Sequence, residues 1–588
     1  MSWWPEDIPP GGKVMKDLQT PRDRRGLVIA TVAGAILVVA LAALTPRTAT
    51  LPQRSDCAQL AVSVSQEKAA LLGEIAEAYN RESQAVAGPC VLVKVASKPS
   101  GTAEEALARG WDDRTDGPRP DVWSPASTSW TVLLQQHRVG RDATSIVPDR
   151  SPSLMQSPLV LAMPVTMAAA LGWPDRPIGW SDVVALARDP RGWGAFGHPE
   201  WGHFRMGKTN PAISTSGLHA LIAAYFAATG RSADLTDADV TDPKVVAFVK
   251  GVESSVVHYG ETASTFLRNL RAADARGAAL SYVSAIAIEE KQIWDYNQGQ
   301  GGVRPAMPLA AVYPKEGTLV ADHPYVVLNA PWVDEGKRAA AAQFLAYIER
   351  AEIQQRFRAA GFRDHEGKAG PEITPASGLL PAGPAIVIAP PAPAVLAHIQ
   401  QSWTDVRKRA RVLMVLDVSG SMSGSKLDLM RRAAASALDQ FAPDDELGLW
   451  TFESTHRELV PISPVAERRD EMKTLIGRLV ANGGTALYAT VHASVEHMTQ
   501  RIDGSRINAV LFLTDGKNEH TDRDLDRVLR ELQNEDEERR VRVFTIAYGA
   551  DADQKVLRQI AEASSGAFYD ATNPATIEKV FTDVVSNF

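Results

Sequence analysis

The sequence predicts an α/β protein with an N-terminal transmembrane helix and two α/β modules that follow it. Three observations support this prediction. Residues 26–44 form an uncharged apolar stretch, and residues 57–390 alternate short apolar strands with longer helical segments. A second alternation of the same kind runs over residues 411–588. This rhythm is typical of sheets with parallel strands, and a chain of 588 residues is too long for a single core.

The apolar stretch near the N-terminus predicts how the chain is oriented in a membrane. It is 19 residues long, which is enough to cross a hydrocarbon core of about 30 Å. Five basic residues precede it: Lys13, Lys16, Arg22, Arg24 and Arg25. We therefore expect a cytoplasmic segment over 1–25, a transmembrane helix over 26–45 and a spacer over 46–56, with the remainder extracellular. A cleaved signal peptide is the alternative, and it also places the remainder outside.

The chain contains only two cysteines, Cys57 and Cys90, and both follow the apolar stretch. An extracellular compartment would permit a disulfide between them. Each cysteine precedes a strand-like segment, and a helical segment lies between the two. If the two strands are parallel neighbours, the cysteines meet at one edge of the sheet, so we predict a Cys57–Cys90 disulfide. Two buried free thiols are the alternative.

The first module is predicted over residues 57–390. Its expected strands are 60–65, 91–97, 120–127, 159–164, 278–285 and 309–314, and its clearest helices are 67–83, 216–230 and 334–350. A section rich in Pro, Gly and Ala follows and should pack partly on this module. Residues 391–410 are expected to form a connecting helix or linker.

The second module is predicted over residues 411–588. Its expected strands are 411–417, 446–452, 457–462, 506–515, 540–549 and 566–571, and helices are expected at 426–441, 485–500 and 552–565. This order predicts a doubly wound, Rossmann-like sheet. Such sheets bind ligands at the carboxyl ends of their strands.

Oxygen-bearing side chains gather at these strand ends. Asp417, Ser419 and Ser421 follow one apolar strand, Asp515 follows another, and Thr485 lies in a glycine-containing loop before a helix. Oxygen ligands suit a hard cation such as Mg²⁺, which readily keeps exchangeable waters. Because the hydroxyls are neutral, the ion should accept a further carboxylate from outside the chain. A strand-to-helix turn with helix-capping serines is the alternative.

Residues 411–588 resemble a von Willebrand factor A domain. The Asp-x-Ser-x-Ser motif of that family matches Asp417, Ser419 and Ser421, its threonine matches Thr485, and its later aspartate matches Asp515. The resemblance implies a metal-ion-dependent adhesion site that holds Mg²⁺ or Mn²⁺. It also implies a protein partner that supplies an Asp or Glu side chain to the metal.

The first module places hydroxyl side chains in several loops at strand ends, which suits a small polar or anionic solute. Ser214, Thr215 and Ser216 precede a helix whose N-terminus offers free N–H groups; ordinary helix capping is the alternative at each position. Through segments such as GKTNPAISTSG, the module resembles a bilobed periplasmic solute-binding protein. The residues that the resemblance places in the cleft between the lobes are Ser65, Ser100, Ser124, Asn210, Ser214, Ser216 and Tyr282.

These features predict a non-enzymatic binding protein of the bacterial cell surface. The formal net charge of −8 argues against a nucleic-acid partner. We find no nucleophile paired with a base, no phosphate-binding loop and no zinc signature. The leading hypothesis is a single-pass membrane protein that binds a protein partner through its adhesion site. Solute capture for transport or sensing by the first module is the alternative.

Overall fold

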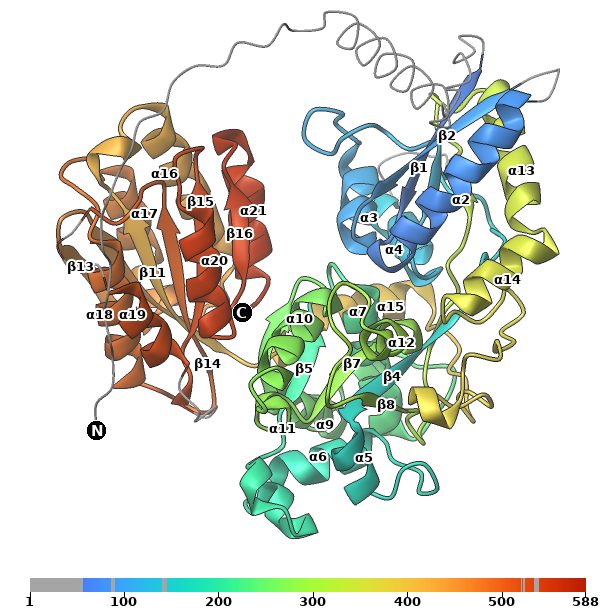
Figure 1. The fold of residues 1–588 in the computed structure, drawn as a ribbon, viewed down its shortest axis with the longest axis horizontal. Coiled ribbons are helices and arrows are strands. Elements are labelled where there is room, and N and C mark those ends of the chain that lie inside the picture. Colours follow the sequence, from blue (N-terminus) through green and yellow to red (C-terminus); the bar gives the residue numbers. More distant parts are fainter. Residues whose placement is uncertain (1–56, 86–89, 140–144, 520, 522–523, 534–538) are drawn as a thin grey trace, which may run out of the picture. The chain divides into compact units, whose positions relative to one another are not determined.

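A computed structural model describes residues 57–588 except 86–89, 140–144, 520, 522–523 and 534–538 (Figure 1). The predicted cytoplasmic segment, transmembrane helix and spacer, residues 1–56, lie outside the described residues. Within the described part of the chain, no helix combines the length and the apolar character that crossing a membrane requires.

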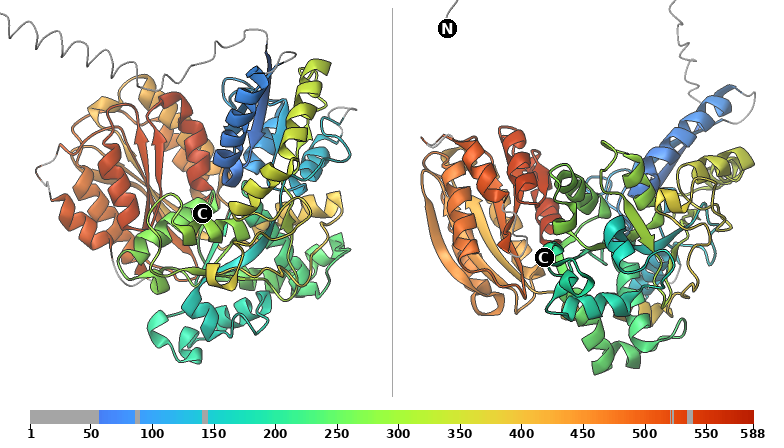
Figure 2. Two further views of the ribbon diagram at one scale, coloured as in Figure 1. Left: turned by 45° about the vertical axis from the view of Figure 1, so that its right-hand side comes forward. Right: turned by 60° about the horizontal axis from the view of Figure 1, so that its bottom comes forward.

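The first lobe of the first module is a sheet with helices on both faces. Its strand order is β10-β3-β1-β2, with β1 (Ala58–Val64), β2 (Val91–Ser97) and β3 (Val122–Ser124) parallel and β10 (Val326–Val327) antiparallel to β3. Helices α2 (Gln66–Ala85) and α13 (Glu335–Ile348) lie side by side on one face (Figure 1, Figure 2). Helices α3 (Ser100–Arg109) and α4 (Ser129–Arg138) pack together on the other face, and α14 (Ala351–Ala359) follows α13.

The second lobe contains a mixed sheet. Its strand order is β6-β5-β7-β4-β8, formed by β6 (Val256–Gly260), β5 (Met206–Thr209), β7 (Ala285–Glu289), β4 (Ser157–Pro164) and β8 (Leu309–Val312). Strand β4 runs antiparallel to β7 and β8, so the expectation of parallel strands holds only for β5, β6 and β7 in this lobe. A further short strand, β9 (Val320–Ala321), pairs with β4.

Helices cover both faces of this second sheet as well. The helices on one face are α10 (Ala263–Asp274), α11 (Ala279–Tyr282) and α12 (Glu290–Gln298). Those packed on the other side are α6 (Trp180–Arg188), α7 (Thr215–Thr229) and α9 (Pro243–Ser254), while α5 (Val165–Ala170) follows β4 and α8 (Asp237–Thr241) precedes α9. The predicted strand over 278–285 was wrong, because residues 279–282 form α11 and the strand begins only at Ala285.

The chain passes between the lobes more than once, because β10 belongs to the first lobe although it follows β8 and β9 in the sequence. The section rich in Pro and Gly packs on the second lobe: the Ile388 N–H donates to the Thr318 carbonyl at 2.8 Å, and Ile388 is buried. Helix α15 (Pro393–Val406) then leads to the last module and packs against α4, α7 and α8.

The last module is a doubly wound sheet with the strand order β13-β12-β11-β14-β15-β16. The strands are β11 (Ala410–Asp417), β12 (Glu446–Phe452), β13 (His456–Pro464), β14 (Ile507–Thr514), β15 (Arg542–Tyr548) and β16 (Phe568–Ala571). Only the edge strand β13 is antiparallel to its neighbour, β12. All six strands were predicted to within two residues at each end.

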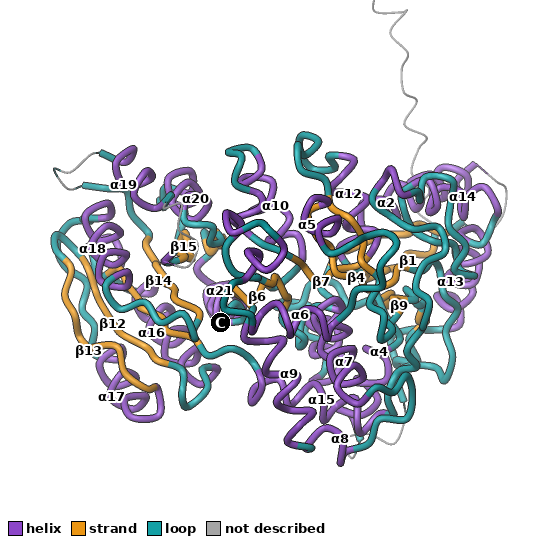
Figure 3. Tube along the Cα trace, turned by 90° about the horizontal axis from the view of Figure 1, so that it is seen from below, coloured by secondary structure: helices purple, strands orange, loops and turns teal. Residues whose placement is uncertain are grey.

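Alternate residues of β11 pack against helices on opposite faces of this sheet. Val412 and Met414 pack toward α16 (Ser425–Ala437), α17 (Val465–Gly477) and α21 (Ile577–Val585). Leu413 and Val415 pack toward α18 (Leu487–Thr499), α19 (Leu525–Leu532) and α20 (Gln554–Ala563). Figure 3 shows the two helix layers with the strands between them. A continuous apolar run is what a strand buried on both faces requires.

The predicted disulfide is confirmed, and Cys57 and Cys90 are the two residues that form it. The bond lies at the point where β1 and β2 begin, because Ala58 is paired with Val91 in parallel register. The Ala58 N–H also donates to the Cys90 carbonyl at 2.9 Å. The disulfide therefore closes a loop that contains all of α2.

Replacing both cysteines by serine is expected to lower the free energy of unfolding of the first lobe by about 2–4 kcal/mol, because the unfolded chain regains the entropy of the open loop. Urea denaturation measures this change. The unsubstituted chain in the presence of a reductant is the matched comparison and should behave like the double variant. A loss well below 1 kcal/mol in both samples would contradict the expectation.

Candidate metal site and solute cleft

Asp417 is the last residue of the central strand β11, and its carboxylate is fully buried. One oxygen, Oδ1, accepts the Ser419 N–H at 2.7 Å, and the other accepts the hydroxyl of Thr514, the last residue of β14. Burial raises the pKa of Asp417 to about 6, and the nearby Asp515 carboxylate acts in the same direction. Hydrogen bonds from two adjacent strand ends therefore fix the orientation of this carboxylate.

A continuous set of hydrogen bonds joins the two serines to Asp515. The Ser419 and Ser421 hydroxyl oxygens are 3.0 Å apart, and the Ser421 hydroxyl donates to Asp515 Oδ1 at 2.7 Å. Lys426, in the first turn of α16, donates to Asp515 Oδ2 at 2.7 Å. Asp515 is buried whereas Ser421 is exposed, so the set leads from the sheet to the surface.

Thr485 reaches the same crevice from a second loop. The Gly420 N–H donates to the Gly483 carbonyl at 3.0 Å, which ties this loop to the serine loop. A methyl group on Gly516 would lie 2.9 Å from the Thr485 hydroxyl oxygen, so that hydroxyl lies against the residue that follows Asp515. The structure thus brings all five predicted residues to one crevice at the carboxyl ends of β11 and β14.

The donor set fits a hard divalent cation. Two carboxylates and three hydroxyls converge, and every donor atom is an oxygen. Neighbouring ligands of an octahedral Mg²⁺ ion with bonds of about 2.1 Å are separated by about 3 Å. The spacing of 3.0 Å between the two serine oxygens matches this geometry. Lys426 adds one positive charge beside Asp515, which an incoming cation would have to tolerate.

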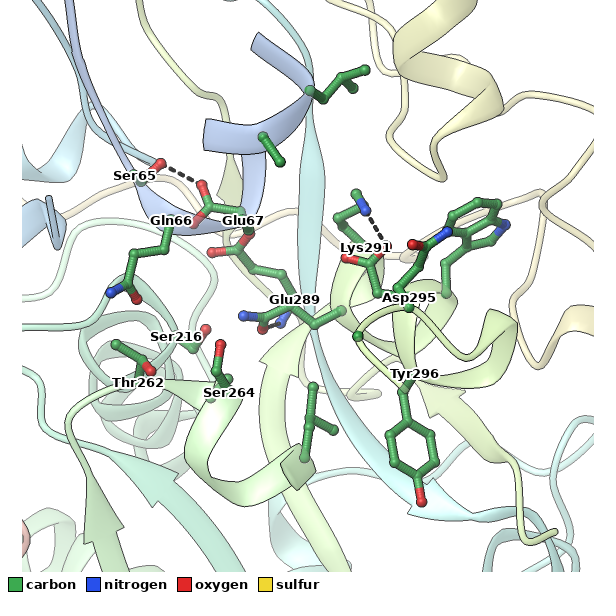
Figure 4. Close-up of a pocket in the computed structure, with 18 of the residues that line it drawn as sticks. Ser65, Gln66, Glu67, Ser216, Thr262, Ser264, Glu289, Lys291, Asp295 and Tyr296 are labelled. Atoms are coloured by element: carbon green, nitrogen blue, oxygen red, sulfur yellow. Dashed lines mark hydrogen bonds and ion pairs between the residues drawn. The ribbon is translucent and has the colours of Figure 1, made fainter. Parts of the chain in front are cut away.

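A second candidate site is a cavity of about 810 Å³ between the two lobes of the first module. Four residues that the sequence placed in the cleft line it: Ser65, Ser100, Ser214 and Ser216. Figure 4 shows Ser65 and Ser216 on different sides of the cavity. Ser100 is buried, and its hydroxyl accepts the Ala126 N–H at 3.1 Å, so it also joins two loops of the first lobe.

Three other predicted residues are not among those that line this cavity. Ser124 is buried at the end of β3, and the Asn210 side-chain oxygen accepts the Ala212 N–H at 2.8 Å in the turn before α7. Tyr282 is buried in the core beside α10 and β7. Each of these residues has a place in the local packing or the turn geometry of its own lobe.

The cavity also contains charged residues that the sequence analysis missed. They are Glu67, Glu74, Arg268, Arg271, Glu289, Lys291, Asp295 and Arg356. Glu289 ends β7, so the error in placing that strand hid it. Two glutamates directly after the apolar segment 285–288 were the signal that could have revealed it.

Comparisons with known proteins agree with this architecture. A family model described as bacterial extracellular solute-binding protein matches residues 60–363, and one described as von Willebrand factor type A domain matches residues 412–583. An uncharacterized protein of Mycobacterium tuberculosis is 25% identical over 527 residues, which cover 86% of this chain and 72% of that protein. An uncharacterized protein of Synechocystis is 31% identical over 172 residues, which cover 29% of this chain and 40% of that protein.

Similar solved structures include representatives of both modules. A von Willebrand factor type A protein from Catenulispora acidiphila is 26% identical with a TM-score of 0.28, and it covers 31% of this chain and 42% of its own. A periplasmic thiamin binding protein is 12% identical with a TM-score of 0.41, and it covers 60% of this chain and 96% of its own.

Proposed function

Because the chain belongs to the bacterial extracellular solute-binding proteins and carries a von Willebrand factor A domain after that module, we propose that it is a metal-dependent adhesion protein of the bacterial cell surface. The metal, Mg²⁺ or Mn²⁺, would be held by Asp417, Ser419, Ser421, Thr485 and Asp515. A protein partner would supply an Asp or Glu side chain to it. The observation that carries this proposal is the convergence of these five oxygen-bearing side chains in one crevice.

The arrangement of this chain's own residues supports binding rather than catalysis. Hydrogen bonds from Ser419 and Thr514 hold the Asp417 carboxylate in place, while Ser421 stands at the exposed side of the crevice. A bound divalent cation would supply an electrophilic centre for a partner's carboxylate. The direct test is capture of a surface protein in Mg²⁺ but not in chelator.

The solute-binding family match and the disulfide also bear on where the protein is located. A solute-binding module indicates an extracellular or periplasmic compartment, and a disulfide is stable there. We further propose that the apolar residues 26–45 anchor the chain in the membrane, with the N-terminus in the cytoplasm. Protease treatment of intact cells, followed by detection of tags at each end of the chain, tests this orientation.

Solute capture for transport or sensing is the second candidate function, and the cavity between the lobes favours it. Serine and threonine side chains and four acidic and four basic residues line that cavity, which suits a polar molecule. Binding of a small solute by the full chain, unaffected by chelator, would support this role independently of adhesion.

Lys426 offers a test that separates metal affinity from partner binding. Its ammonium group contacts Asp515 Oδ2, so replacing Lys426 by Gln removes a positive charge that repels an incoming cation. We expect the affinity for Mg²⁺ to rise by roughly tenfold, as measured by isothermal titration calorimetry. Lys473→Gln is the matched control, because Lys473 pairs with Asp439 away from the crevice. A weaker affinity in Lys426→Gln would contradict this expectation.

A further inference from the structure

Glu289 carries a buried carboxylate that lines the cavity between the lobes. It is the last residue of β7, only 2% of the residue is exposed, and Oε2 has no hydrogen-bond partner among the described residues. A buried carboxylate that is not fully hydrogen-bonded is costly, and because Glu289 lines a cavity, a cationic ligand there would lower that cost. Figure 4 shows Glu289 facing the same space as Glu67.

Glu67 approaches Glu289 from the other lobe. It lies in the first turn of α2 and lines the same cavity. One carboxylate oxygen of each glutamate and one ring nitrogen of His323 all lie within 4.8 Å of one another. The two lobes thus bring two carboxylates together, and both burial and the charge of Glu67 raise the pKa of Glu289 well above its ordinary value.

Lys68 is a buried cation beside this pair, and its protons are already used in hydrogen bonds. The Lys68 ammonium donates to Ser65 Oγ at 2.7 Å, to the Pro125 carbonyl at 3.0 Å and to His323 Nδ1 at 3.0 Å. An ammonium group has three protons, so none remains for Glu289. Lys68 lies 3.8 Å from Glu67. Lys291, which is also buried and whose charge acts on Glu289, is paired with Asp295.

His323 does not supply a positive charge to the two glutamates. Because its Nδ1 accepts from Lys68, the proton of a neutral ring is on Nε2. That nitrogen lies 3.8 Å from Glu289 Oε2, which is too long for a hydrogen bond. A protonated Nε2 cannot ligate a metal, so this tautomer disfavours a metal ion between His323 and Glu289 and favours an organic nitrogen.

Other charges in the cavity are partly paired. Lys291 forms an ion pair with Asp295, and Arg356 forms one with Glu74. Arg268 and Arg271 also line the cavity, with Arg271 over the ring of Tyr296. These guanidinium groups would attract an acidic group of a ligand. The two glutamates would attract a positively charged group of the same ligand.

We propose that the cavity binds a small solute through a positively charged amino or amidino nitrogen, which Glu67 and Glu289 receive from opposite lobes. This inference rests on the solute-binding role given to the first module above. It goes beyond the polar or anionic solute expected from the hydroxyl-bearing loops. Such a nitrogen would stabilise the ionised forms of two carboxylates that lie close together in the cavity.

Calorimetric titration of the full chain in detergent with five probes tests the proposal: L-arginine, spermidine, sulfate, glucose and Zn²⁺. Binding of arginine or spermidine is expected. Glu289→Gln should weaken it by roughly ten- to a hundredfold, because a hydrogen bond to a charged group is lost. Glu74→Gln is the matched control, since Glu74 lines the cavity but is exposed and paired with Arg356; its Kd should change less than about twofold.

Each other outcome is decisive. Unchanged amine binding in Glu289→Gln, with an unaltered circular dichroism spectrum, would overturn the proposal, as would equal losses in both variants. Binding of sulfate or glucose without the amines would overturn it and leave the solute-binding role intact. Zn²⁺ binding that Glu289→Gln abolishes, without amine binding, would assign the cluster to a metal instead. Binding of none of the probes would overturn this inference, and the solute-binding role would then be tested separately with a wider set of solutes.

Discussion

Asp417→Ala is expected to abolish capture of a surface protein partner by the full chain in Mg²⁺. The substitution removes one of the two carboxylates in the crevice and leaves the Thr514 hydroxyl and the Ser419 N–H without their acceptor. Even residues that only orient a metal ligand change metal affinity by 10- to 100-fold, so loss of a carboxylate should reduce affinity by roughly a hundredfold or more. Affinity capture from surface extract, followed by mass spectrometry, measures the effect.

The matched control is Asp428→Ala, which removes an exposed carboxylate that pairs with Arg431 in α16. It should leave capture unchanged. Chelation of the unsubstituted chain should have the same effect as Asp417→Ala, and addition of Mg²⁺ or Mn²⁺ should restore capture. Proteins that are retained equally in Mg²⁺, in chelator and by Asp417→Ala would rule out the adhesion mechanism.

Asp445→Ala is expected to cause the largest loss of stability in the last module. Asp445 is fully buried and accepts hydrogen bonds from Arg407, from the Ala442 N–H at 2.7 Å and from the Ala410 N–H at 2.8 Å. Arg407 is itself only 7% exposed, so the substitution leaves a buried charge without its partner. Breaking such a pair by removing one member costs about 3–5 kcal/mol.

Differential scanning calorimetry measures this loss as a shift of the melting temperature by roughly 10 °C for a domain of this size. Asp444→Ala is the neighbouring control, because the Asp444 side chain is 60% exposed and its ion pair with Arg409 lies at the surface. That pair should contribute less than about 1 kcal/mol. Similar shifts of the melting temperature for the two variants would contradict the expectation that the buried pair contributes more to stability than the surface pair.

The elements of the last module could be predicted from sequence because its central strands are buried on both faces. Such strands are continuous apolar runs, and Asp417 and Asp515 mark where two of them end. Parallel strands end at one edge of the sheet, so the approach of the two aspartates followed from the topology. Thr485 was suggested by its glycine-containing loop before a helix, and the family resemblance assigned the same residue.

The cavity of the first module was less predictable. The segment 278–285 contains residues that favour strands, yet residues 279–282 form a helix whose Tyr282 is buried in the core. Tertiary packing overrode local preference there. The proximity of Glu67 and Glu289 depends on how two separately folded sheets face each other, and hydrophobic periodicity does not encode that relation.

The disulfide has a mechanical consequence for the first lobe. Strand β1 lies between β3 and β2, and Cys57 stands directly before it. A pulling force on the chain ahead of Cys57 would, without the disulfide, load the hydrogen bonds of β1 alone. With Cys57 joined to Cys90, the same load enters β1 and β2 together, so the two strands must shear as one unit. A lobe tied in this way would keep its shape under tension at its N-terminal end.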